Sequence, residues 1–258
     1  MWEYLRAHPE VFMPEQKELQ FFSEHEWWRG LDWYDSVFER AGGAKAVGEA
    51  SPSYTRFPFS SEARDRIAEV LPDVRLVYVV RHPIERIVSQ VRHETERSRE
   101  HRPLDEAALD EDIYVSTSRY AMQAERYLER FPADRLLVIT TESLAADTDR
   151  TMARVYEFLG VDETVRPSAL RKQFGTAEQR RTVVGPARHL RALRGVVPAG
   201  VRHAAWRTLS RPVASKSEQP VLDADVRREL TERLRPDLRR LQPLVGGDFD
   251  CWGLLDGA

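Results

Sequence analysis

Arg81 and Ser89, eight positions apart, are the residues of this sequence best suited to bind a phosphate. An arginine guanidinium binds phosphate through a planar fork of donors, and a serine hydroxyl can add a further hydrogen bond. Taken alone, the two residues could equally be half of a structural salt bridge and a solvated helix residue. The elements around them decide which interpretation is worth testing.

The sequence around this pair predicts a strand, a sharp break and a helix. Residues 76–80 are apolar and rich in β-branched side chains, as in a strand buried on both faces. Pro83 suits the first turn of a helix, and a single apolar stripe follows it at Ile84, Ile87, Val88 and Val91. Ser89 lies on the opposite side of that helix. Because ligands bind at the carboxyl ends of strands and helix starts favour anions, this junction is a predicted anion site.

Composition narrows the class of protein. The 258 residues are 41% hydrophobic, as in an ordinary globular protein, and we take residues 1–258 as a single domain. The net charge of −3, from 39 basic and 42 acidic residues, creates no field that would attract nucleic acid. The single cysteine, Cys251, excludes an intramolecular disulfide and a cysteine-built metal site.

The sequence also bears on location and partners. No apolar run approaches the ~20 residues of a membrane span, and the first residues have no signal-peptide pattern. We therefore expect a cytoplasmic protein of bacterial type, with no membrane or nucleic-acid partner. The oligomeric state cannot be deduced.

Further elements are predicted along the chain. A second buried strand is expected at residues 135–140, and residues 46–54 predict a strand that leads into a turn. Helices are expected at residues 1–8, from Ser60 or Ser61 to Leu71, at residues 116–131, at residues 149–159 ending at Gly160, and after a cap at Asp223. The charged residues 94–112 predict a solvated loop or helix end. Residues 167–220 are basic and irregular, which fits either a lid or a solvated surface.

Several ordered motifs resemble one enzyme family. They are Lys17-Glu18-x-x-Phe21-Phe22, Gly30-x-x-Trp33-Tyr34-x-x-x-Phe38, Gly48-Glu49-x-Ser51-Pro52-x-Tyr54, and the Arg81-x7-Ser89 segment. Together they resemble the glycan-type branch of the sulfotransferases. That branch includes heparan sulfate N- and 3-O-sulfotransferases and many bacterial homologues.

The resemblance implies a fold and a reaction. The fold would be α/β, with a mostly parallel central sheet flanked by helices in the P-loop nucleotide-kinase-like arrangement. The reaction would move a sulfuryl group from 3′-phosphoadenosine 5′-phosphosulfate (PAPS) to a hydroxyl or amine of a small molecule or glycan. No metal is implied.

The resemblance also implies site residues. Arg81 and Ser89 would hold the 3′-phosphate, Glu18 would be the general base, and Lys17 and Glu49 would contact substrate. An aromatic wall beside Glu18 would raise its pKa by desolvation, although a carboxylate at that position could also be an ordinary surface residue. Gln20 stands where the 3-O-sulfotransferases have a histidine, so the acceptor cannot be copied from them.

One part of the family pattern is not found. The family opens with a strand and a Pro-Lys-x-Gly-Thr-Thr type loop around the 5′-phosphosulfate, whereas residues 2–8 here match the helix that follows that loop. Either the sequence begins at an internal methionine of a longer gene product, which we favour, or it is a degenerate homologue that binds the nucleotide without catalysis. A kinase or other NTPase is a weaker alternative, because no G-x-x-x-x-G-K pattern occurs.

Overall fold

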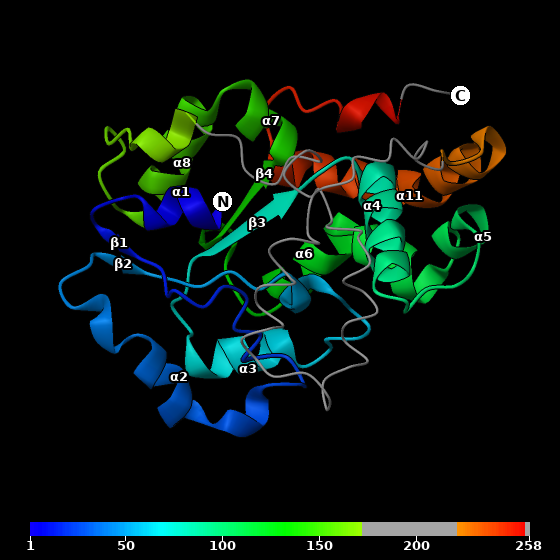
Figure 1. Cartoon of the computed structure of the whole chain (residues 1–258). Helices are drawn as coiled ribbons and strands as arrows, with labels where there is room; N and C mark the ends of the chain where they lie inside the picture. Colours follow the sequence, from blue (N-terminus) through cyan, green and yellow to red (C-terminus); the bar gives the residue numbers. More distant parts are fainter. Residues whose placement is uncertain (172–220, 256–258) are drawn as a thin grey trace, which may run out of the picture. The chain divides into compact units, whose positions relative to one another are not determined.

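The computed structural model describes residues 1–171 and 221–255 (Figure 1). The strands are β1 (Val11–Phe12), β2 (Ala46–Val47), β3 (Leu76–Val80) and β4 (Leu136–Thr140). The α-helices are α1 (Trp2–Arg6), α2 (Leu31–Val37), α3 (Ala63–Val70), α4 (Pro83–Glu96), α5 (Leu104–Ala108), α6 (Tyr120–Leu128), α7 (Thr141–Ala146), α8 (Thr148–Leu159) and α11 (Ala224–Val245). None of these helices has the length and apolarity needed to cross a bilayer.

The two longer strands, β3 and β4, pair in parallel, with Val80 opposite Thr140 at their carboxyl ends. Val77 and Val79 pack into a cluster with α1 and α8, whereas Tyr78 and Val80 pack into a cluster with α4, α6 and α11. Both faces of β3 therefore pack against helices, but only Val80 is fully buried and the other four residues of the strand are half-buried, so the predicted burial is only partly met. The short strands β1 and β2 form a second parallel pair. The α/β class with parallel strands is confirmed.

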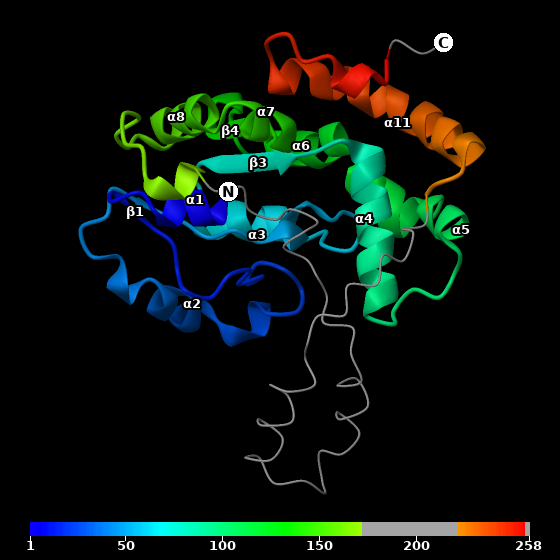
Figure 2. The same cartoon turned by 45° about the horizontal axis from the view of Figure 1, so that its top comes forward.

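Helix α4 begins directly beyond the tip of β3 (Figure 2). Pro83 is its first residue, and His82 precedes it as the N-cap. The predicted apolar stripe is buried, since Ile84, Ile87 and Val91 are each at most 2% exposed. The local sequence thus fixes both the strand–helix junction and the face that α4 buries.

The predicted helix boundaries at Asp223 and Gly160 are confirmed, whereas two predicted helix starts are not. Helix α3 begins after Glu62 without a side-chain cap, and not at Ser60 or Ser61. Asp223 caps α11 through the amide of Asp225, and Gly160 ends α8 in the left-handed region at φ 76°. The helix expected from residue 116 instead begins as the 3₁₀ turn η5 (Ser116–Ser118), and α6 starts at Tyr120. The reason is distant in sequence, because the buried Asp237 of α11 accepts hydrogen bonds from the amides of the first turn of α6.

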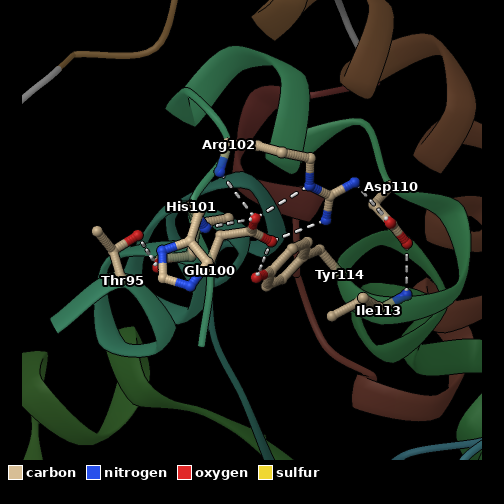
Figure 3. Close-up of polar contacts among 8 residues, drawn as sticks. Thr95, Glu100, His101, Arg102, Asp110, Ile113 and Tyr114 are labelled. Atoms are coloured by element: carbon tan, nitrogen blue, oxygen red, sulfur yellow. Dashed lines mark hydrogen bonds and ion pairs between the residues drawn. The ribbon is translucent and has the colours of Figure 1, made fainter. Parts of the chain in front are cut away.

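The charged segment 94–112 is more ordered than its composition predicts (Figure 3). Glu100 is 7% exposed and accepts hydrogen bonds from the Arg102 guanidinium and the Tyr114 hydroxyl. Arg102 also pairs with Asp110, which caps the π-helix η4 (Glu111–Val115). The prediction of a solvated loop is wrong for this part of the segment. The buried Glu100 carboxylate binds Arg102, and Arg102 in turn binds Asp110, so these charges are held in place. Most of the predicted lid, residues 172–220, lies outside the described residues.

Candidate functional site

Arg81 lies at the carboxyl end of β3, where the sequence places it. Its side chain is half-buried. The next amide, that of His82, donates to the Glu142 carboxylate at 3.0 Å, and Glu142 lies in the first turn of α7, directly after β4. The two strand tips are therefore tied together across the point from which Arg81 projects.

Two further arginines were not identified from the sequence: Arg86, which lies near Arg81, and Arg56, which lies near Arg86. The Arg86 guanidinium donates to Gln90 Oε1 at 2.8 Å and to Ser118 Oγ at 3.0 Å. Burial lowers the pKa of Arg86, and the positive charges of Arg56 and Arg81 lower it further. The Arg56 Nε–H is buried without a hydrogen-bond partner among the described residues. We call Arg56, Arg81 and Arg86 the arginine cluster.

The arginine cluster gathers positive charge at the strand tip, although the Glu85 carboxylate also interacts with Arg81. In the part of the chain that the structure describes, none of its members forms an ion pair with a carboxylate. Like charges brought together and partly desolvated are costly, and a bound anion would relieve that cost. Ser89 is half-buried on α4, three residues after Arg86, so the two share neighbouring positions on the helix surface. Arg86 could have been identified from the sequence, since it lies three residues before Ser89 on the same predicted helix.

The other predicted group lies on the loop after β1. Lys17 and Glu18 are exposed, while Leu19, Phe21 and Phe22 are almost completely buried. Glu18 and Gln20 have φ values of 60° and 54°, in the left-handed region that residues with a Cβ rarely adopt. The buried side chains anchor this loop, which we call the Glu18 loop (residues 18–22), and the unusual backbone turns Glu18 outward.

The aromatic residues expected to form a wall beside Glu18 pack beneath the loop instead. Phe21 stacks on Tyr34, with ring centroids 4.6 Å apart, and Phe22 contacts the rings of Trp27 and Tyr54. These rings belong to a cluster with α3 and the end of α6. Glu18 stays exposed, so the expected desolvation of its carboxylate does not occur.

The carboxylate that is desolvated is that of Glu49. Burial raises the pKa of Glu49, and hydrogen bonds from Ser51 and Tyr54 oppose that rise. Ser51 Oγ donates to Glu49 Oε2 and the Tyr54 hydroxyl donates to Glu49 Oε1, each at 2.6 Å. The same two hydroxyls accept the amides of Gln20 and Phe22, at 2.9 and 3.3 Å. Glu49 is therefore connected to the Glu18 loop through two side chains.

Comparison with known proteins identifies the family. Residues 4–165, more than half of the chain, match the model described as "Sulfotransferase family". The chain belongs to the sulfotransferase family.

Individual relatives agree with that family assignment. The mouse heparan sulfate glucosamine 3-O-sulfotransferase 3B1 is 26% identical over 257 residues, covering 96% of this chain and 60% of the relative. The human bifunctional heparan sulfate N-deacetylase/N-sulfotransferase 3 is 29% identical over 188 residues, covering 62% of this chain and 20% of the relative. The chain thus spans only part of the length of these relatives.

A solved sulfotransferase structure from Alicyclobacillus acidocaldarius shares the fold. It aligns with a TM-score of 0.67 and 23% identity, covering 97% of this chain and 92% of that one. The P-loop-like sulfotransferase fold expected from the sequence motifs is confirmed by this likeness.

Within this fold, the predicted site residues form two groups linked by one segment. Arg81 and Ser89 belong with the arginine cluster at the tip of β3, and Lys17 and Glu18 lie on the loop after β1. The 3₁₀ turn η3 (Pro52–Thr55) lies between them in the chain. Its Tyr54 bonds to the Glu18 loop, and the next residue but one is Arg56 of the arginine cluster. Among the described residues, no group of three or more His, Cys, Asp or Glu is placed to hold a metal ion.

Proposed function

We propose that this sulfotransferase uses PAPS as donor and transfers the sulfuryl group to a hydroxyl or amine of a glycan or small molecule. The observation that carries the proposal is the arginine cluster at the carboxyl end of β3, beside Ser89. A dianionic 3′-phosphate would neutralise the positive charge that the three arginines bring together. Arg81 and Ser89 are the proposed direct ligands, and Arg56 and Arg86 would add to the local positive potential.

Glu18 is the proposed general base. The acceptor oxygen or nitrogen attacks sulfur, the bond between sulfur and the bridging oxygen of the donor breaks, and the acceptor proton passes to the Glu18 carboxylate. The electron pair of the broken bond stays on the departing nucleotide, 3′-phosphoadenosine 5′-phosphate (PAP). Lys17, exposed beside Glu18, would contact the substrate as a mobile positive charge. The heparan sulfate enzymes among the relatives support a glycan as one acceptor class.

The test of the donor site compares two nucleotides on one variant. Arg81→Ala should weaken PAP binding by about 10- to 150-fold, which is the loss of a charged hydrogen bond worth roughly 1.5–3 kcal/mol. Binding of adenosine 5′-phosphate, which lacks the 3′-phosphate, should change much less. Isothermal titration calorimetry with both nucleotides measures the difference.

Arg75→Ala is the matched control, because Arg75 immediately precedes β3, at the opposite end of that strand from Arg81. It should leave both affinities unchanged. Equal losses for the two nucleotides in Arg81→Ala would refute the assignment of the 3′-phosphate to this arginine. Nucleotide binding without any transfer of labelled sulfate to hydroxyl and amine acceptors would favour a binding protein over an enzyme.

A further inference from the structure

The Glu18 loop has a backbone that needs external support. Two of its residues, Glu18 and Gln20, are held at positive φ, a strained conformation for a residue that has a Cβ. Such a conformation persists only where the surroundings determine it. Buried Phe21 and Phe22 anchor one side of the loop, and the hydrogen bonds from its amides anchor the other.

The hydrogen bonds from the loop amides depend on the direction in which two hydroxyl protons point. A serine or tyrosine hydroxyl has one proton to donate and lone pairs to accept with. An ionised carboxylate only accepts, so Glu49 draws the protons of Ser51 and Tyr54 to itself. Their lone pairs are then left for the amides of Gln20 and Phe22.

We propose that Glu49 is a positioning residue for the proposed base: through Ser51 and Tyr54 it holds the Glu18 loop in the conformation that presents Glu18 to the acceptor. The three residues form what we call the Glu49 clamp. The catalytic part of this inference rests on the proposed function, and its structural part does not. In this proposal Glu49 acts through the loop, because each of its oxygens accepts a short hydrogen bond from a side chain that in turn holds a loop amide.

A neutral group at position 49 cannot replace the carboxylate. In the Glu49→Gln variant, the side-chain amide keeps one acceptor oxygen but presents N–H donors in place of the other. One of the two hydroxyls must then accept a hydrogen bond from the glutamine N–H group. Its own proton no longer points toward residue 49 and can turn toward the loop amide, where it competes with the hydrogen bond from that amide. The Ser51 and Tyr54 hydroxyls thus lose their fixed orientation, although the side chain at position 49 keeps its volume.

The test combines residue-resolved hydrogen exchange with kinetics on the full chain. Ser51→Ala should speed exchange of the Gln20 amide by about fivefold, and Tyr54→Phe should do the same for the Phe22 amide, as for the loss of one hydrogen bond. Glu49→Gln should speed exchange of at least one of these amides. Ser53→Ala is the matched control, because Ser53 lies in the same turn and its buried hydroxyl has no partner among the described residues.

A pH series on the wild type adds a second readout. Burial raises the pKa of Glu49, so the clamp should loosen as the pH falls through that raised pKa, relative to Glu49→Gln at the same pH. The groups that face Glu49 are Ser51 just before η3, Tyr54 in η3 and Tyr34 in α2. Burial raises the pKa of both tyrosines, so they stay neutral in this range and Glu49 is the group that titrates.

The kinetic arm separates positioning from general structural damage. Glu49→Gln should lower kcat about tenfold or more, since small misplacements of a reacting group are costly, while KM for the donor stays unchanged. Unchanged exchange at Gln20 and Phe22 in all three variants would overturn the clamp. Faster exchange with an undiminished kcat would overturn its role in positioning Glu18. Absence of sulfuryl transfer in the wild type would count against the proposed function, and exchange would still decide whether the clamp exists.

Discussion

Replacement of Glu100 by glutamine should destabilise the protein more than any ordinary surface substitution in the same segment. The Glu100 carboxylate accepts the amides of His101 and Arg102 and the Arg102 Nε–H at 3.0 Å on one oxygen. Its other oxygen accepts the second Arg102 donor at 2.7 Å and the Tyr114 hydroxyl at 2.9 Å. Glutamine keeps the shape but removes the charge, and it turns a donor toward the guanidinium.

The size of the effect follows from the exposure of the partners. Loss of a charged hydrogen bond removes about 1.5–3 kcal/mol, and unpairing a fully buried ion pair about 3–5 kcal/mol. The lower range applies, because the Arg102 side chain is 34% exposed and retains Asp110 at 3.0 Å. A loss of about 2 kcal/mol corresponds to a fall in Tm of about 4–8 °C for a chain of this size.

Thermal and urea unfolding of Glu100→Gln measure this loss, with Glu94→Gln as the control. Glu94 lies 3.7 Å from Arg99, whose side chain is 66% exposed, so its loss should cost less than about 1 kcal/mol. The hydrogen bonds from Arg102 hold the pKa of Glu100 well below its ordinary value. The Glu100 contribution is therefore present above pH ~4.5 and should shrink as the pH falls below that value. Equal Tm shifts for the two variants at pH 7 would refute the reasoning.

Two further predictions concern the helix start set by α11 and the proposed base. Asp237→Asn should lower Tm by several degrees, because the asparagine side chain can accept from only one of the Ala121 and Met122 N–H groups that Asp237 caps. Thermal unfolding measures this change, and an unchanged Tm would contradict the capping role. Glu18→Gln should lower kcat for sulfate transfer about 10²–10⁴-fold while PAP affinity by calorimetry stays unchanged. Transfer at the parental rate would show that Glu18 is not the base.

The sequence was a reliable guide where local physics decides the structure. The strand β3, the proline that opens α4 and the apolar stripe of α4 all follow from residues within one segment. Gly160 and Asp223 mark helix ends for equally local reasons. The position of Arg81 at a strand tip, and hence the predicted anion site, could be located without knowledge of any long-range contact.

Features that depend on distant partners could not be read in this way. The start of α6 is set by Asp237, which lies more than one hundred residues away in sequence. Glu100 looked like a solvated charge because the sequence does not show that the Tyr114 hydroxyl donates to it or that Asp110 pairs with its partner Arg102. The exposure of Glu18 was likewise invisible, since its motif does not reveal on which side of the loop the aromatic rings pack.

The opposite environments of Glu18 and Glu49 suit them to different tasks. A general base must release its captured proton to water after every turnover, and the exposed Glu18 can do so. Glu49 has the raised pKa that is often associated with a base, but a proton on it would interrupt one of the two hydroxyl contacts that hold the Glu18 loop. A carboxylate that must stay ionised to keep the loop in place cannot also be the group that takes up a proton in each cycle. The raised pKa of Glu49 therefore agrees with a supporting role for that residue, and Glu18 remains the proposed base.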